Sequence, residues 1–232
     1  MDRSDRLSDR EILSLVSLKE LFSGFTHEIA QPLNAIMIAS QVLQLRVQRG
    51  VVSEDEKSFL INRLGIVASQ VQRATQLVDS LRSFGRKRAS KGSTDLKGCF
   101  ESVYSLMGQQ FVGRGLELSW QSVDPLPKST ADSQSIELIL VQALAYARDS
   151  VEAIGVWHDT NAIPYVRSVN VRLYPSRTRS AVGIFWNRGN MRGADDVNPP
   201  ESSVGLAVAE SVLKSLGGNL SAQGASISIL LP

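Results

Sequence analysis

Hydrophobic residues in the first third of the chain recur with the period of bundled helices. One set falls every seven residues between positions 15 and 43: Leu15, Phe22, Ile29, Ile36 and Leu43. Leu18, Phe25 and Ala39 add the second half of that seam. Between positions 60 and 81 the spacings alternate between four and three residues: Leu60, Leu64, Val67, Val71, Ala74, Val78 and Leu81. Both patterns predict long helices that pack through a heptad seam.

A turn is expected between the two helices, because RGVVSED, residues 49–55, contains a glycine. Ser53, followed three residues later by Glu56, predicts a capping box at the start of the second helix. The product is an antiparallel helical hairpin over residues 1–84. A single hairpin cannot bury both sides of such seams, so each chain leaves an apolar stripe exposed. We therefore expect a homodimer whose two hairpins form a four-helix bundle.

The pattern changes at residues 85–95, GRKRASKGSTD, a basic stretch without apolar period that is predicted to be a linker. Over residues 96–232, helical periods and strand-like alternation are mixed. We expect helices at 96–110, 136–154 and 204–216, the last stopped by Gly217-Gly218, and strands at 116–120, 169–173, 182–186 and 227–231. The fold class is thus α followed by α/β: a helical hairpin, then an α/β sandwich with helices on a single face of one mixed sheet.

Composition narrows the function classes only a little. The 232 residues are 43% hydrophobic, enough for a core, and the formal net charge is +2. That balance gives no reason to expect a nucleic-acid or membrane partner. One cysteine, Cys99, excludes an internal disulfide and fits a reducing compartment. No apolar run is long enough to span a bilayer, and the charged N-terminus does not resemble a secretory signal, so we expect a cytoplasmic protein.

One polar face of the first helix carries candidate chemistry. When the seven-residue repeats are placed at heptad position a, His27 falls at position f, farthest from the seam, with Gln31 and Asn34 on the same side. Glu28 follows His27, and Pro32 removes a backbone hydrogen bond and predicts a kink. An exposed neutral imidazole is a good nucleophile, and a neighbouring carboxylate could fix its tautomer. From spacing alone, a reactive histidine and an ordinary solvated one are about equally supported.

HEIAQPLNAI, residues 27–36, resembles the phosphoacceptor box of bacterial two-component sensor histidine kinases, in the subgroup that reads HE-x-x-QPL-x-AI. The resemblance extends over nearly the whole chain, in the family's order of box, hairpin, linker and ATP-binding-type domain. It implies that His27 carries a phosphoryl group and passes it to an aspartate of a response-regulator receiver domain. It also implies that Glu28 is the general base. Gln31 corresponds to the family's dephosphorylation position, where many members have Thr or Asn.

Two nucleotide-binding boxes depart from the family pattern. ARDSVEAIG, residues 147–155, resembles the asparagine box, but Asp149 replaces the magnesium-ligand asparagine. FWNRGNM, residues 185–191, stands in place of the DxGxG box, with Asn187 at the adenine-binding aspartate and Gly189 retained. An aspartate can still ligate Mg²⁺, and an amide oxygen can still accept a hydrogen bond from adenine, although without charge assistance.

The last glycine box has changed more. Residues 202–220, beginning SSVGL, resemble the family's GxGVGL box and its helix, but only Gly205 survives. Glu201 and Ser203 replace the two earlier glycines. Those glycines let backbone approach phosphate closely, and a glutamate there repels a polyphosphate. Together the changes favour loss of ATP binding, so we expect no cofactor. If the site still works, it takes Mg-ATP, with the metal on Asp149 and the nucleotide at the retained box positions.

Three functions stay open on the sequence. The favoured one is a dimeric histidine phosphotransferase, or pseudokinase, in which His27 relays phosphate between receiver aspartates. The second is an ATP-dependent histidine kinase that phosphorylates its own His27 through a divergent site. The third is a noncatalytic protein that binds a receiver domain or regulates a kinase. Expected partners are a second copy and receiver domains, and an upstream hybrid kinase could supply the phosphate. Only 26 residues precede His27, so no sensor domain is expected within the chain.

Overall fold

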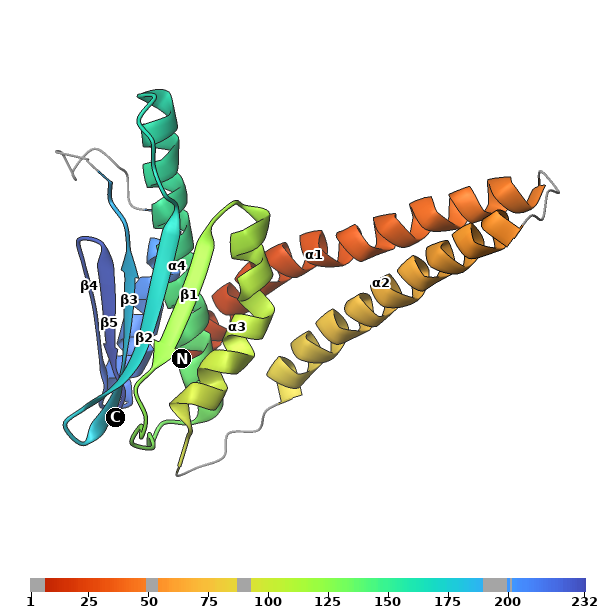
Figure 1. Ribbon diagram of the computed structural model, residues 1–232. Helices are drawn as coiled ribbons and strands as arrows, with labels where there is room; N and C mark the ends of the chain where they lie inside the picture. The colour runs from red at the N-terminus through yellow and green to blue at the C-terminus, as the bar shows by residue number, and fades with distance from the viewer. Residues whose placement is uncertain (1–6, 49–53, 87–92, 190–199, 201) are drawn as a thin grey trace, which may run out of the picture. The chain divides into compact units, whose positions relative to one another are not determined.

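The computed structural model describes residues 7–48, 54–86, 93–189, 200 and 202–232 (Figure 1). The chain forms two compact units: Phe22–Arg86, here called the hairpin unit, and Met1–Leu21 with Lys87–Pro232, here called the α/β unit. The structure thus differs from the expected division, which placed all of residues 1–84 in the hairpin, because the start of the first helix clusters with the α/β unit. Ser53, Glu201 and residues 87–92 of the expected linker lie outside the described residues.

The hairpin unit consists of two long antiparallel helices, as the heptad patterns predict (Figure 1). α1 spans Asp9–Gln48 and runs through Pro32, and α2 spans Glu54–Arg86. Near the turn, Arg46 forms an ion pair with Glu56 at 3.5 Å, and its guanidinium lies over the Phe59 ring, 4.9 Å from the centroid. Among the described residues, no helix combines the length and the apolar character that crossing a membrane requires.

The apolar residues of α2 divide into two stripes, and only one of them is covered. Leu60, Val67, Ala74 and Leu81, spaced by seven residues, are half-buried. Leu64, Val71 and Val78, which alternate with them, are 56%, 49% and 45% exposed. Both stripes belong to the predicted pattern, so half of that pattern is left without a partner inside one chain.

The seam on α1 runs along a different line from the predicted repeat. Within the hairpin unit α1 buries Glu28, Pro32 and Ala39, whereas Phe22 of the predicted seven-residue repeat is 51% exposed. Ile29, Ile36 and Leu43 of that repeat are only half-buried. A helix has a single covered face in a two-helix hairpin, and a seven-residue repeat drifts about 20° per heptad around a straight helix. The repeat therefore lies at the edge of the covered face of α1.

The α/β unit is built on one mixed sheet of five strands in the order β1-β2-β3-β5-β4. The strands are β1 (Glu117–Ser122), β2 (Ser168–Ser176), β3 (Arg179–Trp186), β4 (Asn219–Gln223) and β5 (Ser226–Leu230). β1 pairs with β2 in parallel and the other pairs are antiparallel. β4 was not predicted, because its sequence NLSAQ has no clear hydrophobic alternation.

Three helices cover one face of this sheet: α3 (Leu96–Gly113), α4 (Ser133–Thr160) and α5 (Ser203–Ser215). α3 packs on β1, α4 on the central strands and α5 on β4 (Figure 1). Alternate residues of the central strands, such as Val171 and Ile184, are fully buried beneath them, whereas Phe185 on the opposite face is 43% exposed. The predicted α/β sandwich with helices on a single face is confirmed.

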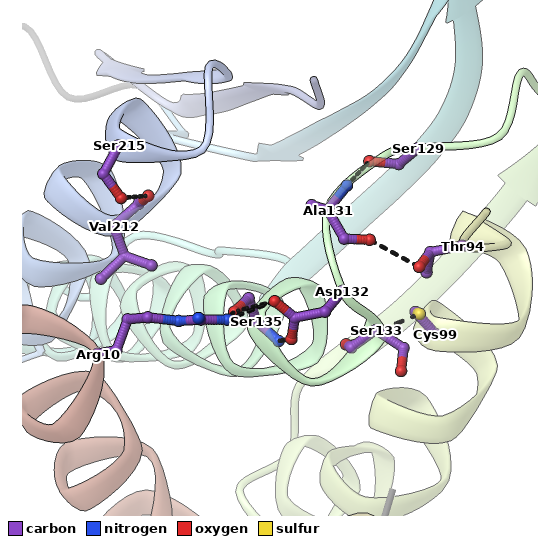
Figure 2. Close-up of polar contacts among 10 residues, drawn as sticks. All are labelled: Arg10, Thr94, Cys99, Ser129, Ala131, Asp132, Ser133, Ser135, Val212 and Ser215. Atoms are coloured by element: carbon purple, nitrogen blue, oxygen red, sulfur yellow. Dashed lines mark hydrogen bonds and ion pairs between the residues drawn. The ribbon is translucent and has the colours of Figure 1, made fainter. Parts of the chain in front are cut away.

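Local sequence signals explain the ends of these helices. Asp95 caps α3 by accepting from the backbone of Lys97, and Asp132 caps α4 by accepting from the backbone of Ser135 at 2.9 Å. Figure 2 shows Asp132 at the start of α4, and Thr94 donating to the carbonyl of Ala131 at 2.6 Å. After α5, Gly217 adopts a φ of +87°, which is the left-handed conformation that glycine favours at a helix end.

We expect Gly218→Ala to destabilise the α/β unit by about 1–3 kcal/mol. An added Cβ would lie 2.5 Å from Cδ1 of Leu213 and 2.7 Å from the backbone oxygen of Leu230, so the chain around β4 has to move. Gly113→Ala is the matched control, because a Cβ there meets no atom within 4 Å. Urea unfolding of both variants measures the effect, and equal stability of the two variants would contradict the packing argument.

Candidate phosphoacceptor site and candidate nucleotide site

His27 lies on the solvent side of α1, as the heptad phasing predicts. Its side chain is exposed, and so are those of Gln31 and Asn34 on the same side of the helix. Pro32 has no backbone N–H to donate to the carbonyl four residues earlier, so the carbonyl of Glu28 loses its intrahelical partner beside His27. The imidazole is therefore open to a second molecule and stands on a locally weakened turn.

Glu28 points into the hairpin unit, unlike His27. Its side chain is 4% exposed, and its Oε1 has no hydrogen-bond partner among the described residues. Burial raises the pKa of this carboxyl to about 7, and the positive charge of Arg73 on α2 only partly opposes the shift. No hydrogen bond joins the Glu28 carboxyl to the His27 ring in the described part of the chain. The carboxylate contact that would fix the imidazole tautomer is thus not formed in this structure.

Asp149, the position of the expected magnesium ligand, is held by arginines of its own unit. Its Oδ1 lies 2.6 Å from the guanidinium of Arg148 and 3.7 Å from that of Arg114. Arg114 also pairs with Glu152 at 2.6 Å. In the residues that the structure describes, no group of three or more His, Cys, Asp or Glu side chains is placed to hold a metal ion. A divalent cation here would have to displace two arginines, so the residues present do not fit a magnesium site.

Asn187 and Gly189 are engaged in a closed turn rather than in an open cradle. The side-chain oxygen of Asn187 accepts from the backbone N–H of Gly189 at 2.8 Å, and its backbone carbonyl accepts from the Tyr165 hydroxyl at 2.6 Å. The oxygen that the resemblance assigns to adenine therefore already has a donor. Gly189 has a φ of +59°, and a Cβ on it would lie 2.3 Å from Nε2 of His158.

The aromatic residues beside Gly189 fill the space next to it. His158 is fully buried, and its Nδ1 lies 2.9 Å from the carbonyl oxygen of Ile154, to which it donates when protonated. Its ring stacks on Tyr165 with ring centroids 4.4 Å apart. Burial raises the pKa of the Tyr165 hydroxyl to about 12. The sequence showed no role for His158, because the contact with Tyr165 is made only when the loop after α4 folds back.

Gly205, the surviving glycine of the last box, serves helix packing in this structure. It lies in the first turn of α5, and a Cβ there would come within 1.8 Å of Oε1 of Gln142 on α4. Gln142 is 1% exposed. Ser203, which replaces an earlier glycine, is the first residue of α5. The glycine is thus needed for the close contact of α5 with the Gln142 amide, and this contact occupies the space beside it.

The predicted residues are therefore distributed over both units. His27, Glu28 and Gln31 lie in the hairpin unit, and the four nucleotide positions lie in the α/β unit. Sequence reasoning missed Arg148, which binds Asp149 and is 3% exposed. An arginine inside the apolar run LILVQALAYARDSVEAI is a signal that could have revealed it, because a buried guanidinium requires acidic partners.

Comparison with known proteins agrees with the hairpin. Residues 17–90 match HisKA, the His Kinase A (phospho-acceptor) domain. The two-component sensor PprA of Pseudomonas aeruginosa is 24% identical over 238 residues, which cover 94% of this chain. The same alignment covers 24% of PprA, so the chain spans about a quarter of the length of that relative.

Solved structures with a similar arrangement include two bacterial signalling proteins. The histidine kinase AdeS of Acinetobacter baumannii has a TM-score of 0.43 at 16% identity, over 88% of this chain and 96% of AdeS. A bacterial phosphotransferase has a TM-score of 0.45 at 17% identity, over 98% of both chains. Similarity at this level has no bearing on activity. The sequence matches show that residues 17–90 are similar to a HisKA phosphoacceptor domain and that the chain is similar to part of a two-component sensor.

Proposed function

We propose that this protein is a dimeric histidine phosphotransferase, in which His27 exchanges a phosphoryl group with aspartates of response-regulator receiver domains. The observation that carries the proposal is the contrast between the two sites. His27 is exposed within a matched phosphoacceptor domain, whereas Asp149 of the nucleotide site is held by Arg148 and Arg114. A chain whose acceptor histidine is exposed, and whose nucleotide-site residues are already paired with each other, is suited to receive phosphate from another protein.

The proposed transfer balances without a nucleotide. A ring nitrogen of His27 attacks the phosphorus of a receiver acyl phosphate, an N–P bond forms, the aspartate O–P bond breaks, and the aspartate leaves as a carboxylate. The proton on the other ring nitrogen passes to a base, and the reverse steps deliver the group to a second receiver. Exposure of His27 supports this proposal, because the attacking nitrogen has to reach into the active site of another protein.

ATP binding is proposed to be lost because each element of the expected site has acquired an internal partner. Asp149 is neutralised by guanidinium groups, the Asn187 oxygen accepts from Gly189, and Gln142 lies against Gly205. A nucleotide would have to break these contacts before making its own. We accordingly propose that the protein uses no cofactor. We also propose a cytoplasmic location, because the single cysteine, Cys99, is a free, buried thiol.

The homodimer is supported by the stripe that the hairpin unit leaves uncovered. The stripe on α2 repeats every seven residues and consists of Leu64, Val71 and Val78, each about half exposed. On α1, Phe22 is also about half exposed. A row of this length is too large to leave in water without cost, and a second hairpin presents the same row by two-fold symmetry. The four-helix bundle buries both stripes of each helix.

Glu28 is the proposed proton acceptor, and its protonation makes the stability of the folded state depend on pH. A carboxyl with a pKa of about 7 can take up a proton near neutral pH, which suits a general base. Because it lies inside the hairpin, reaching the His27 ring requires the side chain or the helix turn at Pro32 to move. The raised pKa also means that the folded state binds a proton that the unfolded state has released.

We first expect wild-type protein to become labelled on His27 by a phosphorylated receiver domain and not by labelled ATP with Mg²⁺. His27→Gln should lose at least 99% of the label, since the nucleophile is removed, roughly the loss seen when a covalent-catalysis nucleophile is deleted. Gln41→Ala, an exposed residue at the same heptad position of α1, is the matched control and should label normally. Label from ATP without another kinase would establish the autokinase alternative, and no label from either donor would leave a noncatalytic binding protein.

We also expect Glu28→Gln to stabilise the protein at pH 8 and to leave its stability nearly unchanged at pH 4. The wild-type carboxyl has a model-peptide pKa of 4.5 when unfolded and about 7 when folded, so its favourable contribution is complete below 4.5 and is lost as the pH rises through 7. The gain at pH 8 should be on the order of 3 kcal/mol. Thermal unfolding at several pH values measures it, and a gain that does not change with pH would refute the buried-carboxyl argument.

Finally, Val71→Glu should convert the dimer to a monomer at micromolar concentration, because it places a charge in the middle of the uncovered stripe. Val156→Glu is the matched control, since Val156 is 62% exposed in the α/β unit and should not affect assembly. Light scattering on both variants and on wild type gives the mass. A wild-type monomer, or a dimeric Val71→Glu variant, is incompatible with the proposed bundle.

A further inference from the structure

The first turns of α1 are folded as part of the α/β unit. These residues, 9–21, are here called the stem of the acceptor helix, and they belong to the same compact unit as the sheet. Leu13, Ser17 and Leu21 follow one another at four-residue spacing on one face of the stem and are 0%, 0% and 2% exposed. A helix that merely emerged from the unit would not bury one complete stripe, so the stem is a packed element of that unit.

Polar contacts join the stem to α4 at three positions along its length. Arg10 forms an ion pair with Asp132 and lies 2.5 Å from the Ser135 hydroxyl at the start of α4, as Figure 2 shows. About two turns later, Ser17 accepts from the Gln142 amide at 2.9 Å and lies 3.3 Å from the carbonyl of Leu138. The stem therefore runs along α4 with its donors and acceptors matched in register.

The last of these contacts is made by a buried cation. Arg148 of α4 is 3% exposed, and its guanidinium donates to Glu20 of the stem at 2.9 Å, to Gln110 of α3 at 2.8 Å and to Asp149. Burial alone would lower the pKa of Arg148, but the carboxylates of Asp149 and Glu20 more than offset it, so the group stays charged. A charge removed from water is tolerated only when its donors are matched. Glu20 is thus one of the groups that make a charged Arg148 possible.

We infer that the α/β unit fixes the position of the acceptor helix by binding its stem. In this arrangement Arg148 is a positioning residue that acts on the helix through Glu20. Glu20 and His27 lie two turns apart on one continuous helix, about 10 Å along its axis. Detaching the stem would expose Leu13 and Leu21 and leave part of the Arg148 charge unmatched. The same arginine occupies Asp149, so the contact that fastens the stem also closes the former metal position. The part of this inference that concerns phosphotransfer rests on the proposed function.

The test compares two carboxylate-to-amide variants of the full-length chain. Glu20→Gln removes the charge that Arg148 finds on the stem. Glu152→Gln is the matched control. It removes the carboxylate of α4 that pairs with Arg114, and this ion pair does not contact the stem. Hydrogen exchange followed by mass spectrometry reports on amides of residues 13–21. We expect exchange there to be about tenfold faster in Glu20→Gln than in wild type, with β3 unchanged, and no change in Glu152→Gln.

Phosphotransfer kinetics then distinguish positioning from packing. With a phosphorylated receiver domain as donor, Glu20→Gln should lower the maximal rate of His27 labelling by about three- to tenfold, with the half-saturating receiver concentration within about twofold of wild type. Exchange equal to wild type in Glu20→Gln overturns the inference that the stem is held. Faster exchange with an unchanged maximal rate overturns the positioning role. If wild-type protein accepts no phosphate, the proposed function fails, and the exchange data still decide whether the α/β unit holds the stem.

Discussion

A guanidinium buried between helices has to be neutralised where it lies, and Arg148 imposes this constraint on much of the α/β unit. Its partners come from three helices: Gln110 of α3, Asp149 of α4 and Glu20 of α1. The Coulomb attraction between the buried charges is strong because little water screens it. The desolvation cost of each charge is also large, so the arrangement is stable only when every donor has an acceptor. The positions of α3, α4 and the beginning of α1 are thus coupled through one side chain.

The core of the α/β unit is built from residues other than those of the candidate nucleotide boxes. The sheet and its three helices pack through apolar faces that include Val171 and Ile184, both fully buried. The box positions have neighbours within the unit: arginines at Asp149, a backbone N–H at Asn187 and the Gln142 side chain beside Gly205. The first two contacts satisfy polar groups of the boxes, so these residues are compatible with a well-packed unit.

The hairpin unit differs from the α/β unit because two helices cannot cover each other on all sides, so part of its apolar surface stays exposed. The half-buried and exposed stripes of α2 are offset by only three or four residues, and the exposed His27 side of α1 belongs to neither stripe. The exposed apolar residues therefore mark the surface on which the proposed second hairpin would pack, and the polar face with His27 and Gln31 stays exposed. Glu28 is the exception, a carboxyl on the covered side, and its raised pKa follows directly from that position.

The sequence by itself determined the features that depend on neighbours along the chain. The heptads predicted both long helices, the period of 3.6 residues put His27 on the open face, and alternation revealed all strands but β4. Only the tertiary structure decided which stripe of α1 is covered, that Glu28 turns inward, and that the stem packs with the α/β unit. The same holds for the ion pair of Asp149 with Arg114, which follows α3, and for that of Arg148 with Glu20 of α1. Periodicity fixes the face on which a residue lies, whereas burial and charge pairing depend on contacts between segments far apart in the chain, and no local pattern encodes them.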